Sequence, residues 1–149
     1  MVTWLNASFE MRFRLIGRVT VRFAASEAHA DHALLLSPWP ESLLAFEPVW
    51  WRLAQRTHLV AVDPPRFGHS QRSDSLLSPQ AMGEFIVRVA DAFGLETPHV
   101  VGPDIGTAAA LFAAARHPGR LRSLAAGSGA AAVPLQLGGH DGRRIAGKQ

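Results

Sequence analysis

Apolar and charged residues alternate along residues 9–24 with a period of two, and the alternation breaks at Gly17. The apolar positions are Phe9, Met11, Phe13, Leu15, Val19, Val21 and Phe23. Successive side chains of a strand point to opposite faces, so this pattern is typical of strands with one face in solvent. The sequence therefore predicts two antiparallel strands, a hairpin, at one edge of a sheet.

Four later stretches are short and largely apolar, as expected of strands buried in a sheet. They cover residues 33–36, 58–63, 98–101 and 121–126. Segments with helical spacing separate them, over residues 43–56, 79–93 and about 105–117. Pro48 interrupts the first segment, so its regular part is expected after Phe46. Alternating strands and helices predict an α/β fold with a mostly parallel sheet and helices on both faces.

The segment 79–93 carries the clearest helix signals. Ser78 can cap the helix, Pro79 suits its first turn, and Gly94 can end it. Its apolar positions are Phe85, Ile86, Val89, Ala90 and Phe93. They share one face at helical spacing, so we expect this helix to pack on the sheet through that face.

Three loops follow the predicted parallel strands, over residues 37–42, 63–70 and 104–106. Crossovers between parallel strands are right-handed, so these loops should meet at one edge of the sheet. Open parallel sheets bind their ligands at this carboxyl edge. We therefore expect a small-molecule substrate to bind there.

The third loop contains the sequence Gly-Pro-Asp-Ile-Gly at residues 102–106, with Asp104 at its centre. Gly-x-Asp-x-Gly has the spacing of a nucleophile elbow, a sharp strand-to-helix turn that exposes its central side chain. The positive end of the following helix favours negative charge on Asp104 and an oxyanion formed there. A carboxylate in this position can attack carbon and form an ester. The alternative is that Asp104 only caps the helix, because aspartate is a preferred N-cap residue.

Composition argues against several classes of function. The chain has 149 residues, 48% of them hydrophobic and 18% charged, which suits one globular domain. It has no cysteine, and its seven histidines lack metal-ligand spacing, so we expect no metal and no cofactor. The formal charge of +3 without a basic–aromatic stripe indicates no nucleic-acid binding. We see neither a membrane span nor a signal peptide, and we expect a cytoplasmic protein.

Four motifs occur in a fixed order along the chain. Residues 34–42 read Leu-Leu-Leu-Ser-Pro-Trp-Pro-Glu-Ser, residues 62–70 read Val-Asp-Pro-Pro-Arg-Phe-Gly-His-Ser, and residues 116–121 follow the turn at Asp104 as Arg-His-Pro-Gly-Arg-Leu. In this order and spacing, residues 12–137 resemble the α/β-hydrolase superfamily, specifically its branch with an aspartate nucleophile, the epoxide hydrolases and haloalkane dehalogenases. The first two motifs are similar to that branch's strand with His-Gly-x-Pro and to its Asp-x-x-Gly-x-Gly-x-Ser loop.

The resemblance implies a role for three residues. Asp104 would be the nucleophile, and the backbone N–H groups of Trp39 and Ile105 would form the oxyanion hole. The implied reaction opens an epoxide or displaces a halide to give an alkyl-enzyme ester, which water activated by a histidine then hydrolyses.

The sequence departs from this branch at several positions. Ser37 and Pro38 stand where the branch has His and Gly, and Arg66 replaces the first Gly of the turn after Asp63. Ile105 occupies the position where dehalogenases of this kind have a halide-binding Trp, which leaves Trp39 as one halide donor. Epoxide hydrolases polarise the epoxide with a Tyr, and this chain contains none.

In the family, a cap, an acid and a histidine follow the nucleophile. Residues 128–137 still resemble the approach to the cap, whereas residues 138–149 resemble nothing that follows. We therefore predict a partial α/β-hydrolase core domain over residues 9–137, truncated and inactive alone, and a disordered tail over residues 138–149. His140 and Asp141 are adjacent in this tail and cannot form the nested geometry of a triad.

Two other readings stay open. The first is a non-catalytic interaction protein, or an inactive fragment, that keeps the α/β-hydrolase fold. Its exposed edge strand near Leu121 would pair with another chain, for instance in a homo-oligomer. The second is dinucleotide binding, which the sequence disfavours because no Gly-x-Gly-x-x-Gly follows a first strand.

Overall fold

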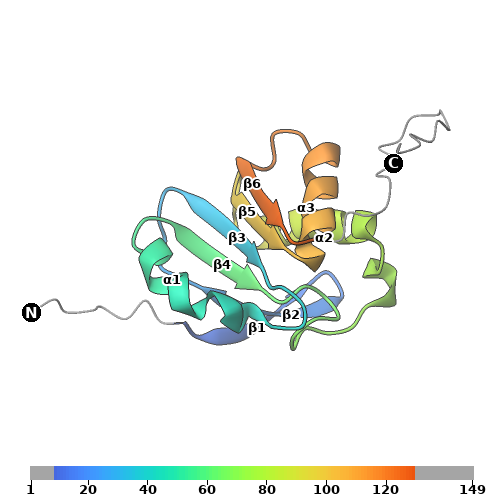
Figure 1. Ribbon diagram of the computed structural model, residues 1–149, viewed down its shortest axis with the longest axis horizontal. Coiled ribbons are helices and arrows are strands. Elements are labelled where there is room, and N and C mark those ends of the chain that lie inside the picture. Colours follow the sequence, from blue (N-terminus) through green and yellow to red (C-terminus); the bar gives the residue numbers. More distant parts are fainter. Residues whose placement is uncertain (1–8, 130–149) are drawn as a thin grey trace, which may run out of the picture.

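The computed structural model describes residues 9–129, which build a six-stranded mixed sheet with helices on both sides (Figure 1). The strands are β1 (Met11–Ile16), β2 (Val19–Ala25), β3 (His32–Leu36), β4 (His58–Val62), β5 (His99–Pro103) and β6 (Ser123–Gly127). Their order across the sheet is β1-β2-β4-β3-β5-β6. Strand β2 pairs antiparallel with β1 and β4, whereas β4, β3, β5 and β6 run parallel to one another. The predicted parallel sheet and N-terminal antiparallel hairpin are confirmed.

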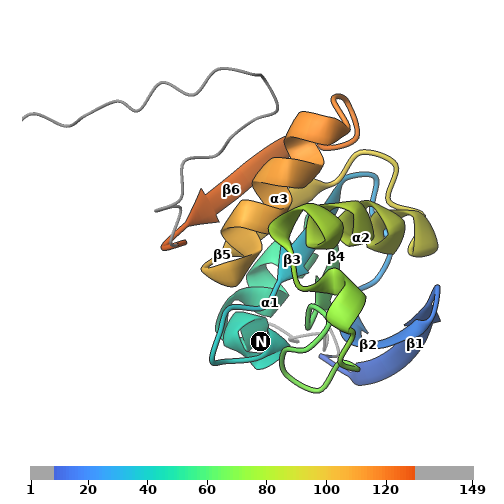
Figure 2. The same cartoon turned by 90° about the vertical axis from the view of Figure 1, so that its right-hand side faces the viewer.

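The helices lie where the sequence predicts them. They are α1 (Glu47–Ala54) after the 3-10 helix η1 (Leu43–Phe46), α2 (Pro79–Ala92) after the 3-10 helix η2 (Asp74–Leu76), and α3 (Ile105–Arg116). Pro48 lies in the first turn of α1, so the regular helix begins after Phe46 as expected. Helices α2 and α3 lie side by side (Figure 2). A Cβ at Gly83 of α2 would come within 2.9 Å of the Ala109 carbonyl of α3, so glycine permits their close approach.

Strand β3 shows how the two faces of the sheet are buried. Leu34 and Leu36 pack into the cluster that α2 and α3 cover, and Leu35 packs with Trp50 of α1 on the other face. All of these side chains are almost fully buried. Central parallel strands are therefore apolar on both faces, which is why their sequences read as continuous hydrophobic runs.

Strand β1 differs from the simple prediction of one apolar face against the core. Three of its apolar residues are exposed, with 41% of Met11, 59% of Phe13 and 66% of Leu15 accessible to solvent, whereas Ile16 at its end is buried. Arg12 and Arg14 instead lie over the rings of Phe23 and Phe93 on the α2 face. Period-two alternation locates a strand, but it does not show which face the neighbouring elements cover.

Part of the sequence prediction concerns residues outside the described range. The predicted core domain, residues 9–137, extends past residue 129, and the predicted tail, residues 138–149 with His140 and Asp141, lies wholly outside the described residues. Within residues 9–129, no helix is long and apolar enough to span a membrane.

Replacing Ser78 with alanine is expected to lower the free energy of unfolding by about 1 kcal/mol. The Ser78 hydroxyl accepts a hydrogen bond from the Ala81 N–H at 3.1 Å and caps α2. Urea denaturation followed by circular dichroism measures the loss. Ser73 is the matched control, because it occupies the N-cap of η2 without a side-chain cap bond. Equal losses in the two alanine variants would contradict the assigned role of the cap.

Candidate active site

Asp104 lies at the junction of β5 and α3, with backbone angles φ 50° and ψ −116°. L-residues rarely adopt positive φ, and such strain persists only where the surroundings hold it. Two glycines permit the turn: a Cβ at Gly102 would approach the Gly106 carbonyl oxygen to 2.7 Å, and one at Gly106 would meet Leu36 at 3.2 Å. The strand therefore turns into the helix over very few residues, glycine is required at position 102, and a larger residue at position 106 would press on Leu36.

The Asp104 carboxylate does not cap α3, although Asp104 occupies the N-cap position. Its Oδ2 accepts a hydrogen bond from the backbone N–H of Trp39 at 3.0 Å, across two strand ends. Within residues 9–129, Oδ1 has no hydrogen-bond partner. One carboxylate oxygen is thus held by the loop after β3, while the other stays available to a ligand.

Thr107 and β6 support this turn from behind. The Thr107 hydroxyl lies 2.8 Å from the Gly102 carbonyl and 3.1 Å from the Gly127 carbonyl. The Asp104 N–H also donates to the Gly127 carbonyl, at 2.9 Å. The strained residue is therefore fixed by hydrogen bonds from β5, α3 and β6 together.

Asp63, the residue after β4, fixes the other two loops. It is fully buried and lies 2.9 Å from the Arg22 guanidinium. Its carboxylate accepts hydrogen bonds from the N–H groups of Leu43, at 2.7 Å, and His69, at 3.0 Å. A Cβ at Gly68 would lie 2.1 Å from this carboxylate, so only glycine fits there. One buried ion pair thus ties the hairpin, η1 and the loop after β4 to the same edge.

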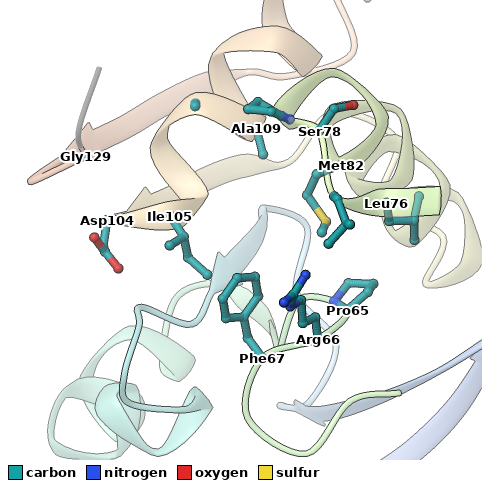
Figure 3. A pocket seen from close by; sticks show the side chains of 13 residues that line it. Pro65, Arg66, Phe67, Leu76, Ser78, Met82, Asp104, Ile105, Ala109 and Gly129 are labelled. Carbon is teal, nitrogen blue, oxygen red and sulfur yellow. The ribbon is translucent and has the colours of Figure 1, made fainter. Parts of the chain in front are cut away.

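A cavity of about 380 Å³ opens beside Asp104 between α3, the start of α2 and the loop after β4 (Figure 3). Its lining residues are Pro65, Arg66, Phe67, Leu76, Leu77, Ser78, Pro79, Met82, Asp104, Ile105, Ala108, Ala109 and Gly129. Most of them are apolar, as is usual in a small-molecule site. The loops after β4 and β5 meet here, and the loop after β3 reaches the same edge through Trp39 and its bond to Asp104.

The two predicted oxyanion-hole residues lie on either side of Asp104. Trp39 donates its N–H to the carboxylate and leaves 62% of its surface exposed. Ile105 begins α3 and lines the cavity, so its N–H has no acceptor within the helix. Ser37 is fully buried and donates its N–H to the Val62 carbonyl, so it extends the β3–β4 pairing by one residue. The loop that carries Trp39 therefore starts from a fixed point.

Three histidines that the sequence offers near the strand ends and helices make structural contacts. His99 Nδ1 lies 2.7 Å from the Ser123 hydroxyl, and His117 Nε2 lies 2.8 Å from Glu84. His69 contributes its backbone N–H to Asp63 and lines a shallow hollow beside Trp39. No histidine lines the cavity at Asp104 among residues 9–129. The same residues contain no cluster of histidine and acidic side chains that could hold a metal.

Arg22 is the site-supporting residue that the sequence pattern missed. Its position in the alternation of β2 suggests a solvent-facing side chain, yet only 7% of Arg22 is exposed. The aspartate that ends β4 is the available signal, because a buried carboxylate requires a cationic or hydrogen-bonding partner.

Comparison with known proteins gives the family. Residues 34–140 match the family described as the alpha/beta hydrolase fold. A 2-hydroxymuconate semialdehyde hydrolase of Pseudomonas putida is 34% identical over 90 residues, which cover 59% of this chain and 32% of that protein. The chain therefore matches only about a third of this curated relative's length.

Solved structures agree on the fold. The match to the epoxide hydrolase CorEH covers 78% of this chain and 41% of that protein, with a TM-score of 0.73 and 19% identity. A loop variant of the haloalkane dehalogenase DbeA from Bradyrhizobium elkanii matches 78% of the chain and 39% of its own length, with a TM-score of 0.70 and 25% identity. The sheet order, the strained turn after β5 and the matched residues together show that this chain belongs to the α/β-hydrolase fold family.

Proposed function

We propose that the chain carries the nucleophile of a hydrolase that acts on epoxides or alkyl halides. Asp104 would attack an electrophilic carbon through Oδ1 and form an alkyl ester. The observation that carries the proposal is the asymmetric environment of its carboxylate, in which Trp39 holds Oδ2 and no described residue holds Oδ1. An oriented carboxylate with one unpaired oxygen is what nucleophilic attack on carbon requires.

The two backbone N–H groups beside Asp104 would act at a later stage. Once the ester has formed at Oδ1, Oδ2 is its carbonyl oxygen. Attack of water on the ester carbon would place negative charge on Oδ2, and the N–H groups of Trp39 and Ile105 would stabilise that oxyanion. Trp39 lies within hydrogen-bond distance of this oxygen already.

The second half of the reaction needs a base that activates water. No histidine lines the cavity among residues 9–129, so the described residues supply none. We therefore expect the described residues by themselves to form the ester and to stop there.

Incubation with an alkyl bromide followed by mass spectrometry of proteolytic peptides tests the proposal. The expected result is one alkyl group per chain, located on Asp104. Because the chain has no cysteine, the most reactive competing nucleophile is absent. A folded protein that gains no alkyl group at Asp104 would overturn the proposal and favour a non-catalytic member of the family.

Self-association through β6 stays a prediction, as does location in the cytoplasm. Strand β6 lies at one side of the sheet over residues 9–129, opposite β1, and most of its residues are exposed. An unpaired strand edge is a template for pairing with another strand. Concentration-dependent sedimentation is the expected behaviour, and a single monomeric species at all concentrations would contradict it.

A further inference from the structure

Arg66 occupies a backbone conformation that is unfavourable for an arginine. Its φ is +80°, in the left-handed region where glycine is the usual residue. The turn itself is made by the backbone, since the Arg66 N–H donates to the Gln71 carbonyl at 3.2 Å. The fold therefore needs the turn at this position, but nothing in the turn requires a cationic side chain.

The Arg66 side chain also has no protein partner among the described residues. Two other arginines near this edge of the sheet are paired: Arg22 of β2 with Asp63, and Arg72 of the loop after β4 with Asp74. No hydrogen bond or ion pair within residues 9–129 involves the Arg66 guanidinium. An unpaired guanidinium beside an apolar wall is suited to an anionic ligand, because its planar set of donors matches a carboxylate.

Arg66 lines the cavity that contains Asp104, and it is the only cation among the described lining residues. Figure 3 shows the guanidinium among the cavity residues, with the side chains of Ile105 and Phe67 between it and Asp104. Along this cavity wall, apolar side chains therefore lie between a nucleophile and a positive charge.

We propose that Arg66 selects the substrate, and that the preferred substrate is an elongated molecule with an electrophilic carbon at one end, an apolar middle and a carboxylate at the other. This proposal rests on Asp104 being the nucleophile. The carboxylate pairs with Arg66, the apolar segment lies along Phe67 and Ile105, and the electrophilic carbon meets Asp104. With an ω-bromo acid, a lone pair of Oδ1 forms the new C–O bond, and the C–Br electrons leave with bromide.

The test compares 6-bromohexanoate with its neutral analogue 6-bromohexanamide, which has the same length and the same reacting carbon. Mass spectrometry follows the rate of alkylation at Asp104 in the full chain. We expect the acid to react faster than the amide. Arg66→Gln should slow the acid about tenfold, the effect of one charge-assisted hydrogen bond, and slow the neutral amide much less, because the amide forms no ion pair with the guanidinium. Arg66→Lys should keep part of the preference, and added salt should reduce it.

Arg56→Gln is the matched control. Arg56 is exposed and lies just before β4, at the opposite edge of the sheet from the cavity, so its loss changes the net charge equally without touching the site. Alkylation of Asp104 by both compounds at equal rates, or an equal effect of the two glutamine variants, overturns the role of Arg66 and leaves the nucleophile in place. Failure of both compounds to alkylate Asp104 overturns the nucleophile, and the substrate class with it.

Discussion

Asp104→Asn is expected to abolish alkylation at this position, with a loss of about a thousandfold or more. An amide oxygen is a far weaker nucleophile than a carboxylate oxygen, so the C–O bond does not form. The substitution keeps the size of the side chain, and the amide oxygen can still accept the N–H of Trp39 in place of Oδ2. Asparagine also tolerates positive φ. The variant should therefore fold as the parent chain does.

Mass spectrometry measures the rate at which 6-bromohexanamide alkylates the parent chain and the Asp104→Asn variant. Asp91→Asn is the control, because Asp91 lies near the end of α2 in an exposed ion pair with Arg120, whereas α2 meets the cavity at its start. Both variants should unfold at the urea concentration of the parent. Alkylation that continues in Asp104→Asn at the parent rate would show that another group reacts, and the proposed function would be wrong.

The central strands and helices could be predicted because the signals that specify them lie within a few neighbouring residues. Leu34, Leu35 and Leu36 are buried on both faces, so the run is apolar throughout and reads as a central strand. Ser78 and Pro79 mark the start of α2 through chemistry that is confined to one helical turn. The predicted strand at 121–126 is observed as Ser123–Gly127, a difference at the element's ends, where local signals are weakest.

Features that depend on distant parts of the chain could not be predicted. Arg22 and Asp63 are 41 positions apart in the sequence, and no local pattern predicts that they form a pair. The exposure of Phe13 depends on α1 packing over β3 and β4 and leaving β1 uncovered. The spacing around Asp104 does suggest a sharp turn, but its hydrogen bond to Trp39 follows from the position of β3 beside β5.

Asp63→Ala is expected to lower the free energy of unfolding by about 3–5 kcal/mol, because it leaves the Arg22 charge buried without a partner. Only 7% of Arg22 is exposed, so water cannot replace the lost carboxylate. The buried N–H of Leu43 loses its acceptor as well, which adds a desolvation cost. Natural domains are stable by about 5–15 kcal/mol, so this loss is a large fraction of the total.

Urea denaturation of Asp63→Ala and Asp74→Ala compares the loss of a carboxylate from a buried ion pair with the loss of one from an exposed ion pair. Asp74 also pairs with an arginine, Arg72, but both side chains are largely exposed, and such a pair contributes about 0–1 kcal/mol. A second substitution, Arg22→Met, should recover part of the stability lost in Asp63→Ala, since it removes the uncompensated charge. Recovery stays incomplete because the N–H groups of Leu43 and His69 still lack their acceptor. Equal unfolding midpoints for the two alanine variants would show that the buried pair does not hold the hairpin, η1 and the loop after β4 together.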